Sequence, residues 1–172
     1  MSKAFKGEDA SEAPLVVPPR APLPPGVENY VTAGGLVALK AEHERLLVER
    51  ARAETSAAVD DGDRPRTLAM LGERVAALED RLATARLVEP GSQPHGEVRF
   101  GARVTVRAEN GEERRYRIVG VDEADVEHGQ IAFVAPLARA LLGKHAGETA
   151  VVRTPRGEEE LDVVSVDYGA ES

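Results

Sequence analysis

The chain has 172 residues, a formal net charge of −8 at pH 7 and no cysteine. The lack of cysteine excludes a disulfide framework, a thiolate metal site and a cysteine nucleophile. Proteins that bind nucleic acid on their own do so largely by neutralising its phosphates with positive charge. Because this chain has a net negative charge, we expect any contact with nucleic acid to be made through a partner protein.

The first 29 residues contain six of the eleven prolines. Proline fixes φ and removes an N–H donor, so residues 1–29 are predicted to form a flexible tail, with a polyproline ligand for a partner domain as the alternative. The same segment lacks the hydrophobic core of a signal peptide, and no apolar run reaches the roughly 18 residues of a membrane span. We therefore expect a cytoplasmic protein with no membrane partner.

Two segments with helical periodicity follow, and they predict an antiparallel helical hairpin over residues 30–90. Thr32 suits the N-cap of the first helix. In the second helix, Pro65 suits the first turn, and the carboxylate of Asp63 could cap the free amides there. The second helix has its apolar residues on one stripe with a 3,4,3,4,3 spacing: Leu68, Leu71, Val75, Leu78, Leu82 and Ala85.

The break between the two helices, VDDGDRPR at residues 59–66, carries a dense group of carboxylates. Arms of about 25 residues, rising about 1.5 Å per residue, place this break roughly 35 to 40 Å from the base. Asp60, Asp61 and Asp63 could act only as turn formers and caps. Alternatively, the rod could deliver them to a site where they help hold Mg²⁺ and an attacking water. Spacing alone does not choose between these interpretations.

From residue 91 onward the pattern is typical of strands, which predicts a second domain over residues 91–172. EVRFGARVTVRAE and EERRYRIVGV, joined by Asn110-Gly111, predict a hairpin with a type I′ turn. GQIAFVAPLARALLG predicts a short strand and then one helix that begins at Pro136 and ends at Gly143. ETAVVRTP and EEELDVVSVDY predict two more strands. The predicted fold class is α+β, a helical hairpin followed by a small antiparallel sheet with one short helix.

The sequence shows no catalytic motif that would act alone. The four histidines have no metal-ligand spacing, and there is no GxSxG, P-loop or Rossmann glycine pattern. We expect neither a self-contained active site nor a tightly bound cofactor.

Three groups of segments resemble the Gre family of bacterial transcript cleavage factors, its GreB branch more than GreA: NYVTAGGLVAL, VRFGARVTVR with RYRIVGVDE, and PLARALLGKHAGE. The resemblance covers residues 29–168. It implies that the C-terminal domain has an FKBP-like fold and docks on the rim of the RNA polymerase secondary channel, while the hairpin projects to the active centre.

The resemblance also implies that this protein and the polymerase each supply part of the catalytic site. The tip acids would help hold a Mg²⁺ shared with the active centre, and the polymerase's own aspartates would complete its coordination. The polymerase would then hydrolyse the nascent RNA of a backtracked complex. The protein itself would be no enzyme, and it would meet RNA only within the polymerase complex.

The tip departs from the pattern G-D-x-x-E-N of family members that are active in cleavage. Gly62-Asp63 matches its first half, but Arg66 takes the glutamate position. Both arms are also shorter than is usual in the family. Asp63 is therefore the best-matched catalytic and metal-binding candidate, with Asp61 or Asp60 as second ligand, and Arg64 and Arg66 would weaken metal binding. The alternative is a Gre-like regulator or inhibitor that occupies the channel without supporting cleavage.

The resemblance assigns polymerase binding to Ala135, Pro136, Leu137 and Ala138. Their alternative role is structural, with Pro136 beginning a helix and Leu137 packing beneath the sheet. A remote alternative function, peptidyl-prolyl isomerase, follows from the FKBP-like fold alone, which does not carry function. Because a hairpin that buries its own stripe gives no reason to dimerise, we expect a monomer.

Overall fold

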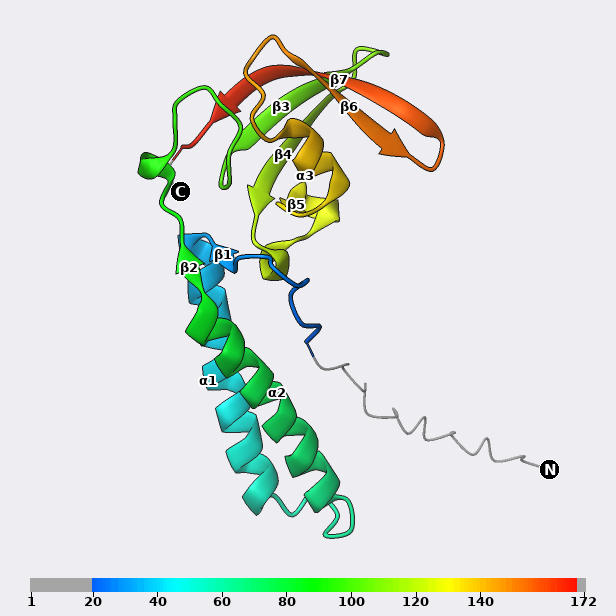
Figure 1. The fold of residues 1–172 in the computed structure, drawn as a ribbon. Coiled ribbons are helices and arrows are strands. Elements are labelled where there is room, and N and C mark those ends of the chain that lie inside the picture. Colours follow the sequence, from blue (N-terminus) through cyan, green and yellow to red (C-terminus); the bar gives the residue numbers. More distant parts are fainter. Residues whose placement is uncertain (1–19, 170–172) are drawn as a thin grey trace, which may run out of the picture.

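The computed structural model describes residues 20–169, in which a helical hairpin projects from a five-stranded sheet (Figure 1). The α+β fold class predicted from the sequence is confirmed. Residues 1–19, which make up most of the predicted tail, lie outside the described residues, as do residues 170–172. The predicted tail and domain boundaries stay predictions.

The hairpin consists of α1 (Ala33–Thr55) and α2 (Arg64–Thr84). The predicted N-cap of α1 is confirmed, because Thr32 Oγ1 accepts a hydrogen bond from the N–H of Gly35 at 3.0 Å. The two apolar stripes bury each other between the helices and form a core of their own. Its buried members are Val31, Leu39, Leu46, Ala53, Leu71, Val75 and Leu78.

The base of the hairpin differs from the prediction. α2 ends at Thr84 rather than near Pro90, and β2 (Arg86–Leu87) then pairs in parallel with β1 (Tyr30–Val31). Asn29 Nδ2 donates to the C=O of Arg81 at 2.7 Å, which binds the chain before the hairpin to the end of α2. Two strands of two residues each show no alternation, so the sequence pattern does not reveal them.

The sheet has the strand order β5-β4-β3-β7-β6. Its strands are β3 (Arg103–Ala108), β4 (Glu113–Val119), β5 (Gln130–Ala132), β6 (Thr149–Thr154) and β7 (Gly157–Asp167). The predicted antiparallel arrangement holds for all neighbours except β4 and β5, which are parallel. The chain between β4 and β5 passes through two short 3-10 helices, η2 (Val121–Glu123) and η3 (Val126–His128), and so returns in the same direction.

The β3–β4 connection is the predicted hairpin, but the predicted type I′ turn is wrong. A type I′ turn needs φ > 0 at both central residues. In the described chain only glycines have positive φ, Gly111 among them at 81°. The N–H of Gly111 donates to the C=O of Ala108, and the N–H of Ala108 donates to the C=O of Glu112, each at 2.9 Å. The loop therefore has three residues, and Gly111 supplies its left-handed position.

One face of the sheet is covered by the short helix α3 (Pro136–Leu141), as predicted. Ala138 and Leu141 of this helix are fully buried against the sheet, and Gly143 follows with φ 84°. Most of the buried core residues come from the strands: Val104, Val106, Ala108, Ile118, Ile131, Ala150, Val152, Leu161 and Val163. Within the part of the chain that the structure describes, no helix is long and apolar enough to cross a membrane.

Candidate functional site

The three candidate aspartates lie at the end of the hairpin that is remote from the sheet (Figure 1). The loop of residues 56–63 joins the two helices there, and Asp60, Asp61 and Asp63 are all exposed. The side chain of Asp61 is 95% exposed. A partner can therefore reach all three carboxylates without rearranging the protein.

Asp60 shapes the turn mainly through its backbone. Its C=O accepts hydrogen bonds from the N–H groups of Asp63 and Arg64, both at 3.0 Å. Its Oδ1 also accepts a long hydrogen bond of 3.3 Å from the N–H of Gly62, the local contact by which aspartate favours turns. The carboxylate of Asp60 is thus lightly engaged.

Asp63 precedes α2, but the predicted capping by its side chain is wrong. Its backbone is helical, with φ −93° and ψ −14°, whereas a capping side chain accompanies an extended backbone. Among residues 20–169 its carboxylate has no hydrogen-bond or ion-pair partner. Asp63 is therefore the most available of the three carboxylates.

Arg64 organises the loop, whereas the sequence pattern indicated only a charge that would weaken metal binding. Its Nη2 forms an ion pair with Asp61 Oδ1 at 3.0 Å. Its guanidinium also donates to four backbone carbonyls around the end of α1: Ala53 at 2.9 Å, Glu54 at 2.8 Å, Ser56 at 3.1 Å and Val59 at 3.2 Å. Basic side chains favour helix C-termini, so an arginine close after a predicted helix end was the available signal.

The three carboxylates do not form a metal site by themselves. Within residues 20–169, no group of three or more His, Cys, Asp or Glu side chains could hold a metal ion. Asp61 is paired with Arg64, and the exposed Arg66 adds a second positive charge to the tip. Carboxylate oxygens are nevertheless the donors that Mg²⁺ prefers. The tip can therefore contribute ligands to a site whose other ligands come from a partner.

The predicted polymerase-binding segment, residues 135–138, lies where the chain enters α3. Pro136 is exposed at the first position of the helix, while Ala138 is fully buried. Ala135 and Leu137 are half-buried and pack against the core of the sheet. The segment thus exposes Pro136, while its neighbouring residues pack against the core of the sheet and hold it in place.

A carboxylate of η2 joins the sheet to the first turn of α1. Glu123 Oε2 accepts from the N–H groups of Thr32 at 3.1 Å and Gly120 at 3.2 Å, and Oε1 accepts from the hydroxyl of Thr32. A Cβ at Gly35 would lie 2.1 Å from Glu123 Cδ, so only glycine permits this approach. Gly35, near the start of α1, therefore has a packing reason.

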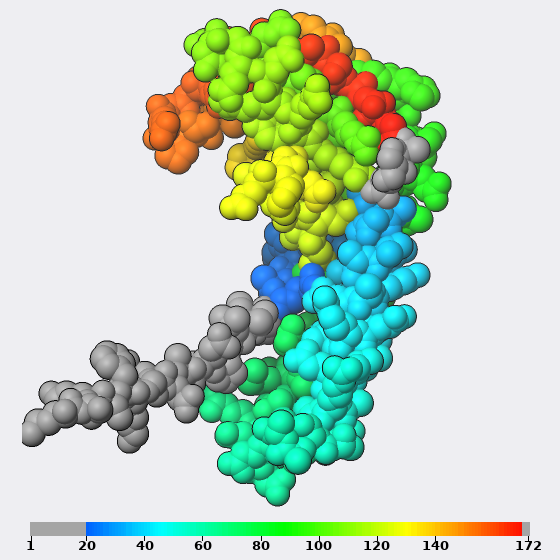
Figure 2. All heavy atoms as spheres, turned by 180° about the vertical axis from the view of Figure 1, so that it is seen from behind, coloured from blue at the N-terminus to red at the C-terminus, as the bar shows by residue number. Residues whose placement is uncertain are grey.

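Asp122 extends the same junction to α2 and to the segment before the hairpin. Its side chain, 8% exposed, pairs with Arg81 of α2, Nε to Oδ2, at 3.2 Å, and with Arg20. Arg20 also pairs with Glu42 of α1. Burial lowers the pKa of Arg20, but the charges and hydrogen bonds of Asp122 and Glu42 outweigh it and raise that pKa above its ordinary value. Figure 2 shows the described N-terminal segment, in blue, lying between the hairpin and the sheet.

An aromatic cluster lies at this junction as well. The rings of Tyr30, Phe100 and Phe133 have centroids 5.6 to 5.8 Å apart. Tyr30 belongs to β1 at the base of the hairpin, and Phe133 comes two residues before Ala135. The cluster therefore connects the base of the hairpin with Phe133, which shortly precedes the segment at residues 135–138.

Comparison with known proteins gives a consistent family. The family described as "Transcription elongation factor, GreA/GreB, C-term" matches residues 93–168. Transcription elongation factor GreA of Anaeromyxobacter sp. (strain K) is 38% identical over 151 residues, which cover 80% of this chain and 91% of that protein. Transcription elongation factor GreB of Pseudomonas aeruginosa is 39% identical over 150 residues, which cover 80% of this chain and 89% of that protein.

A solved structure, described as prokaryotic transcription elongation factor GreA/GreB from Nitrosomonas europaea, is 22% identical, with a TM-score of 0.41. The match covers 83% of this chain and 99% of that one. The identities to the GreA and GreB relatives, 38% and 39%, are too close to favour either branch. The GreB-like assignment made from the sequence is therefore not resolved.

Proposed function

The chain belongs to the GreA/GreB family of transcription elongation factors, and from this we propose that it binds RNA polymerase and assists transcript cleavage in backtracked complexes. Factors of this family stimulate a hydrolysis that is intrinsic to RNA polymerase rather than catalysing one themselves. The partner is then the polymerase, and nascent RNA is met only within that complex.

The observation that carries the proposal is the placement of exposed carboxylates at the far end of a thin rod. α1 has 23 residues and α2 has 21. At about 1.5 Å per residue these helices are each about 30 to 35 Å long, and two packed helices are only about 20 Å wide. Such a hairpin can enter a channel that excludes the sheet, and it would bring Asp60, Asp61 and Asp63 to the active centre through the secondary channel.

The tip would contribute proton acceptors and ligands. Asp63, whose carboxylate has no hydrogen-bond or ion-pair partner within residues 20–169, is the first candidate to orient a water beside the RNA phosphate, and Asp60 is the second. When bound in the active centre, Mg²⁺ supplies charge neutralisation at the phosphoryl oxygens. Because the ion is shared with the polymerase, the chain needs no tightly bound cofactor of its own.

Docking is assigned to residues 135–138 at the start of α3. The exposed Pro136 is held by a buried neighbour, Ala138, so it offers a rigid contact. Phe133 ties this segment to Tyr30 at the base of the hairpin. Docking here would therefore fix the direction in which the hairpin enters.

The experiment that tests the proposal follows RNA length in stalled, backtracked complexes of the cognate polymerase at near-neutral pH. We expect shortened transcripts to form faster when the protein is added. Equal rates with and without the protein, at concentrations that saturate binding, would overturn the cleavage role.

A second candidate function is a channel-occupying regulator or inhibitor without cleavage activity. Two observations favour it: Arg66 is exposed where active relatives are expected to carry glutamate, and Arg64 neutralises Asp61. Such a protein would slow initiation or elongation and leave transcript length unchanged. Rapid cleavage at low magnesium would contradict this second candidate.

A further inference from the structure

Arg64 is the first residue of α2, and its side chain crosses the tip loop to the end of α1. Nη1 donates to the carbonyls of Ala53 and Glu54 at 2.9 and 2.8 Å. Nη2 donates to those of Ser56 and Val59 at 3.1 and 3.2 Å. The side chain is only 23% exposed, although it lies in the most protruding part of the described chain.

These contacts meet a specific need of the backbone. The last four carbonyls of a helix have no intrahelical donor, and a positive charge near them is favourable. A guanidinium presents five N–H donors in a flat, rigid fork, whereas the lysine ammonium carries three donors at one point. A single arginine can therefore satisfy several diverging carbonyls at once, which a lysine at residue 64 could not do.

The same side chain governs the three aspartates. Asp61 is held directly by the ion pair of 3.0 Å. Asp60 and Asp63 are held indirectly, because the C=O of Asp60 accepts from the N–H groups of Asp63 and of Arg64 itself. Fixing Arg64 against the end of α1 therefore fixes the turn that carries the other two acids.

We propose that Arg64 is the positioning residue of the tip: its guanidinium fixes the loop so that Asp60 and Asp63 project outward while Asp61 is held to the side. This inference rests on the proposed function of the tip in transcript cleavage. Arg64 binds no metal, since its charge repels cations. Its contribution is geometrical, and it restricts the conformations of a loop with few buried contacts of its own.

The first part of the test needs no polymerase. Because the chain has no cysteine, spin labels can be placed at two exposed positions, Ala57→Cys in the loop and Ala83→Cys near the base of α2. Pulsed EPR then gives the distribution of tip-to-base distances. We expect the distribution of tip-to-base distances to be narrow in the parent protein and broad in Arg64→Ala. Arg64→Lys keeps the charge but not the fork, so it should not restore the narrow distribution.

The matched control is Arg66→Ala. It removes the same charge from the same turn, and within residues 20–169 the Arg66 side chain has no hydrogen-bond or ion-pair partner. Its distance distribution should equal that of the parent. Far-UV circular dichroism on all variants shows whether both helices are intact. A parent-like distribution in Arg64→Ala would overturn the proposal.

The second part measures transcript cleavage as a function of protein concentration. A misplacement of about 1 Å can cost about a hundredfold in rate, so the maximal rate with Arg64→Ala should fall about ten- to a hundredfold. The half-saturating concentration should stay the same, because the docking segment is untouched. An unchanged maximal rate with a broadened tip would also overturn the proposal. If the parent protein itself supports no cleavage, the proposed function fails, and the distance measurement alone decides whether Arg64 shapes the tip.

Discussion

At the scale of single residues, the tip carboxylates differ in how strongly the protein itself engages them. Asp61 is paired with Arg64, and Asp60 accepts one long hydrogen bond from Gly62. The carboxylate of Asp63 has no hydrogen-bond or ion-pair partner among the described residues. A carboxylate that is already paired with a cation is a weaker ligand for another cation. The three acids should therefore contribute unequally.

We predict that Asp63→Ala lowers the maximal rate of transcript cleavage more than Asp61→Ala does. The loss of a group that orients the reacting water costs about a hundredfold. Asp61→Ala should cost less than about tenfold, since its carboxylate is already paired with Arg64. Cleavage rates at saturating concentrations of each variant measure the difference. A larger loss for Asp61→Ala would show that its ion pair with Arg64 breaks in the complex.

The sequence pattern located the acidic tip but not the roles within it. Asp63 was predicted to cap α2, yet its backbone is helical and its side chain makes no capping hydrogen bond. Arg64 was expected only to weaken metal binding, although its guanidinium donates hydrogen bonds to backbone carbonyls at the end of α1. Both outcomes depend on the path of an eight-residue loop, which no periodicity in the sequence specifies.

At the scale of elements, the hairpin is stabilised by the core between α1 and α2. Leu78 is 1% exposed at the centre of the α2 stripe, and Leu71 is 4% exposed. Leu47 of α1 fits the helical period less well and is 42% exposed. The regular spacing of the α2 stripe was sufficient to predict the buried positions of Leu71 and Leu78.

We predict that Leu78→Ala destabilises the hairpin by about 2 to 5 kcal/mol, because it removes buried methyl groups and leaves a cavity. The matched change Leu47→Ala should cost about 0.5 kcal/mol, as surface substitutions do. Urea unfolding followed by the helical circular dichroism signal measures both. Equal costs would mean that the two helices do not pack as described.

Some elements could be predicted from the sequence because they are locally encoded, and others could not. β6, β7 and α3 follow from alternation, Pro136 and Gly143. The pairing of β4 with β5 is parallel because the connection through η2 and η3 brings the chain back to run in the same direction, and those turns have no strong local signature. The type I′ prediction failed because a three-residue loop needs only one positive φ, at Gly111.

At the scale of the whole molecule, the junction decides where the tip points. Arg20, Arg81, Asp122 and Glu42 form a connected group of two cations and two anions between hairpin and sheet. Arg20 comes from the proline-rich segment, and Arg81 is 6% exposed. Their partners are distant in sequence, so composition and periodicity could not reveal this network.

We predict that Arg20→Ala loosens the orientation of the hairpin relative to the sheet, because Glu42 and Asp122 each lose their ion pair with Arg20. Spin labels at Ala57→Cys and Val151→Cys report that orientation as a distance distribution, and Val151 is 50% exposed on β6. The distribution should broaden in Arg20→Ala.

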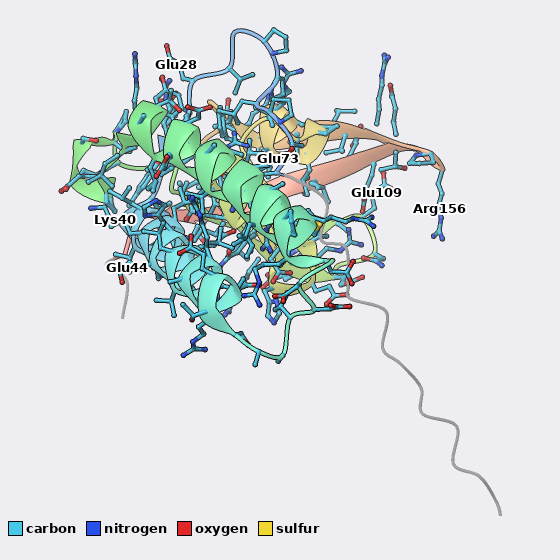
Figure 3. All side chains as sticks on the ribbon, turned by 90° about the horizontal axis from the view of Figure 1, so that it is seen from below. Glu28, Lys40, Glu44, Glu73, Glu109 and Arg156 are labelled. Atoms are coloured by element: carbon cyan, nitrogen blue, oxygen red, sulfur yellow. The ribbon has the colours of Figure 1, made fainter. Side chains whose placement is uncertain are left out.

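The control for this change is Arg156→Ala, which removes the same charge from the β6–β7 turn. Figure 3 shows Arg156 on the opposite side of the view from Lys40 and Glu44 of α1. This variant should leave the distribution of the parent unchanged. Superimposable distributions for Arg20→Ala and the parent would contradict the role of the N-terminal segment in the junction.

We predict that binding to RNA polymerase and support of cleavage depend on residues at opposite ends of the molecule. Pro136→Asp should weaken binding to core RNA polymerase by about 1 to 3 kcal/mol, because it places a charge in a contact that must lose its water. Pro155→Asp, at the exposed β6–β7 turn, is the matched control and should bind like the parent. Competition binding measures both, with circular dichroism to confirm folding. Unchanged affinity for a folded Pro136→Asp would remove this segment from the interface.

The role of the exposed tip carboxylates in transcript cleavage can be tested by removing all three charges together. Transcript length is followed in backtracked complexes saturated with either the parent protein or the variant in which Asp60, Asp61 and Asp63 are all changed to asparagine. We predict that the variant binds RNA polymerase with the parent's affinity and leaves cleavage at the rate seen without protein. Cleavage at the parent's rate by the bound triple variant would contradict the claim.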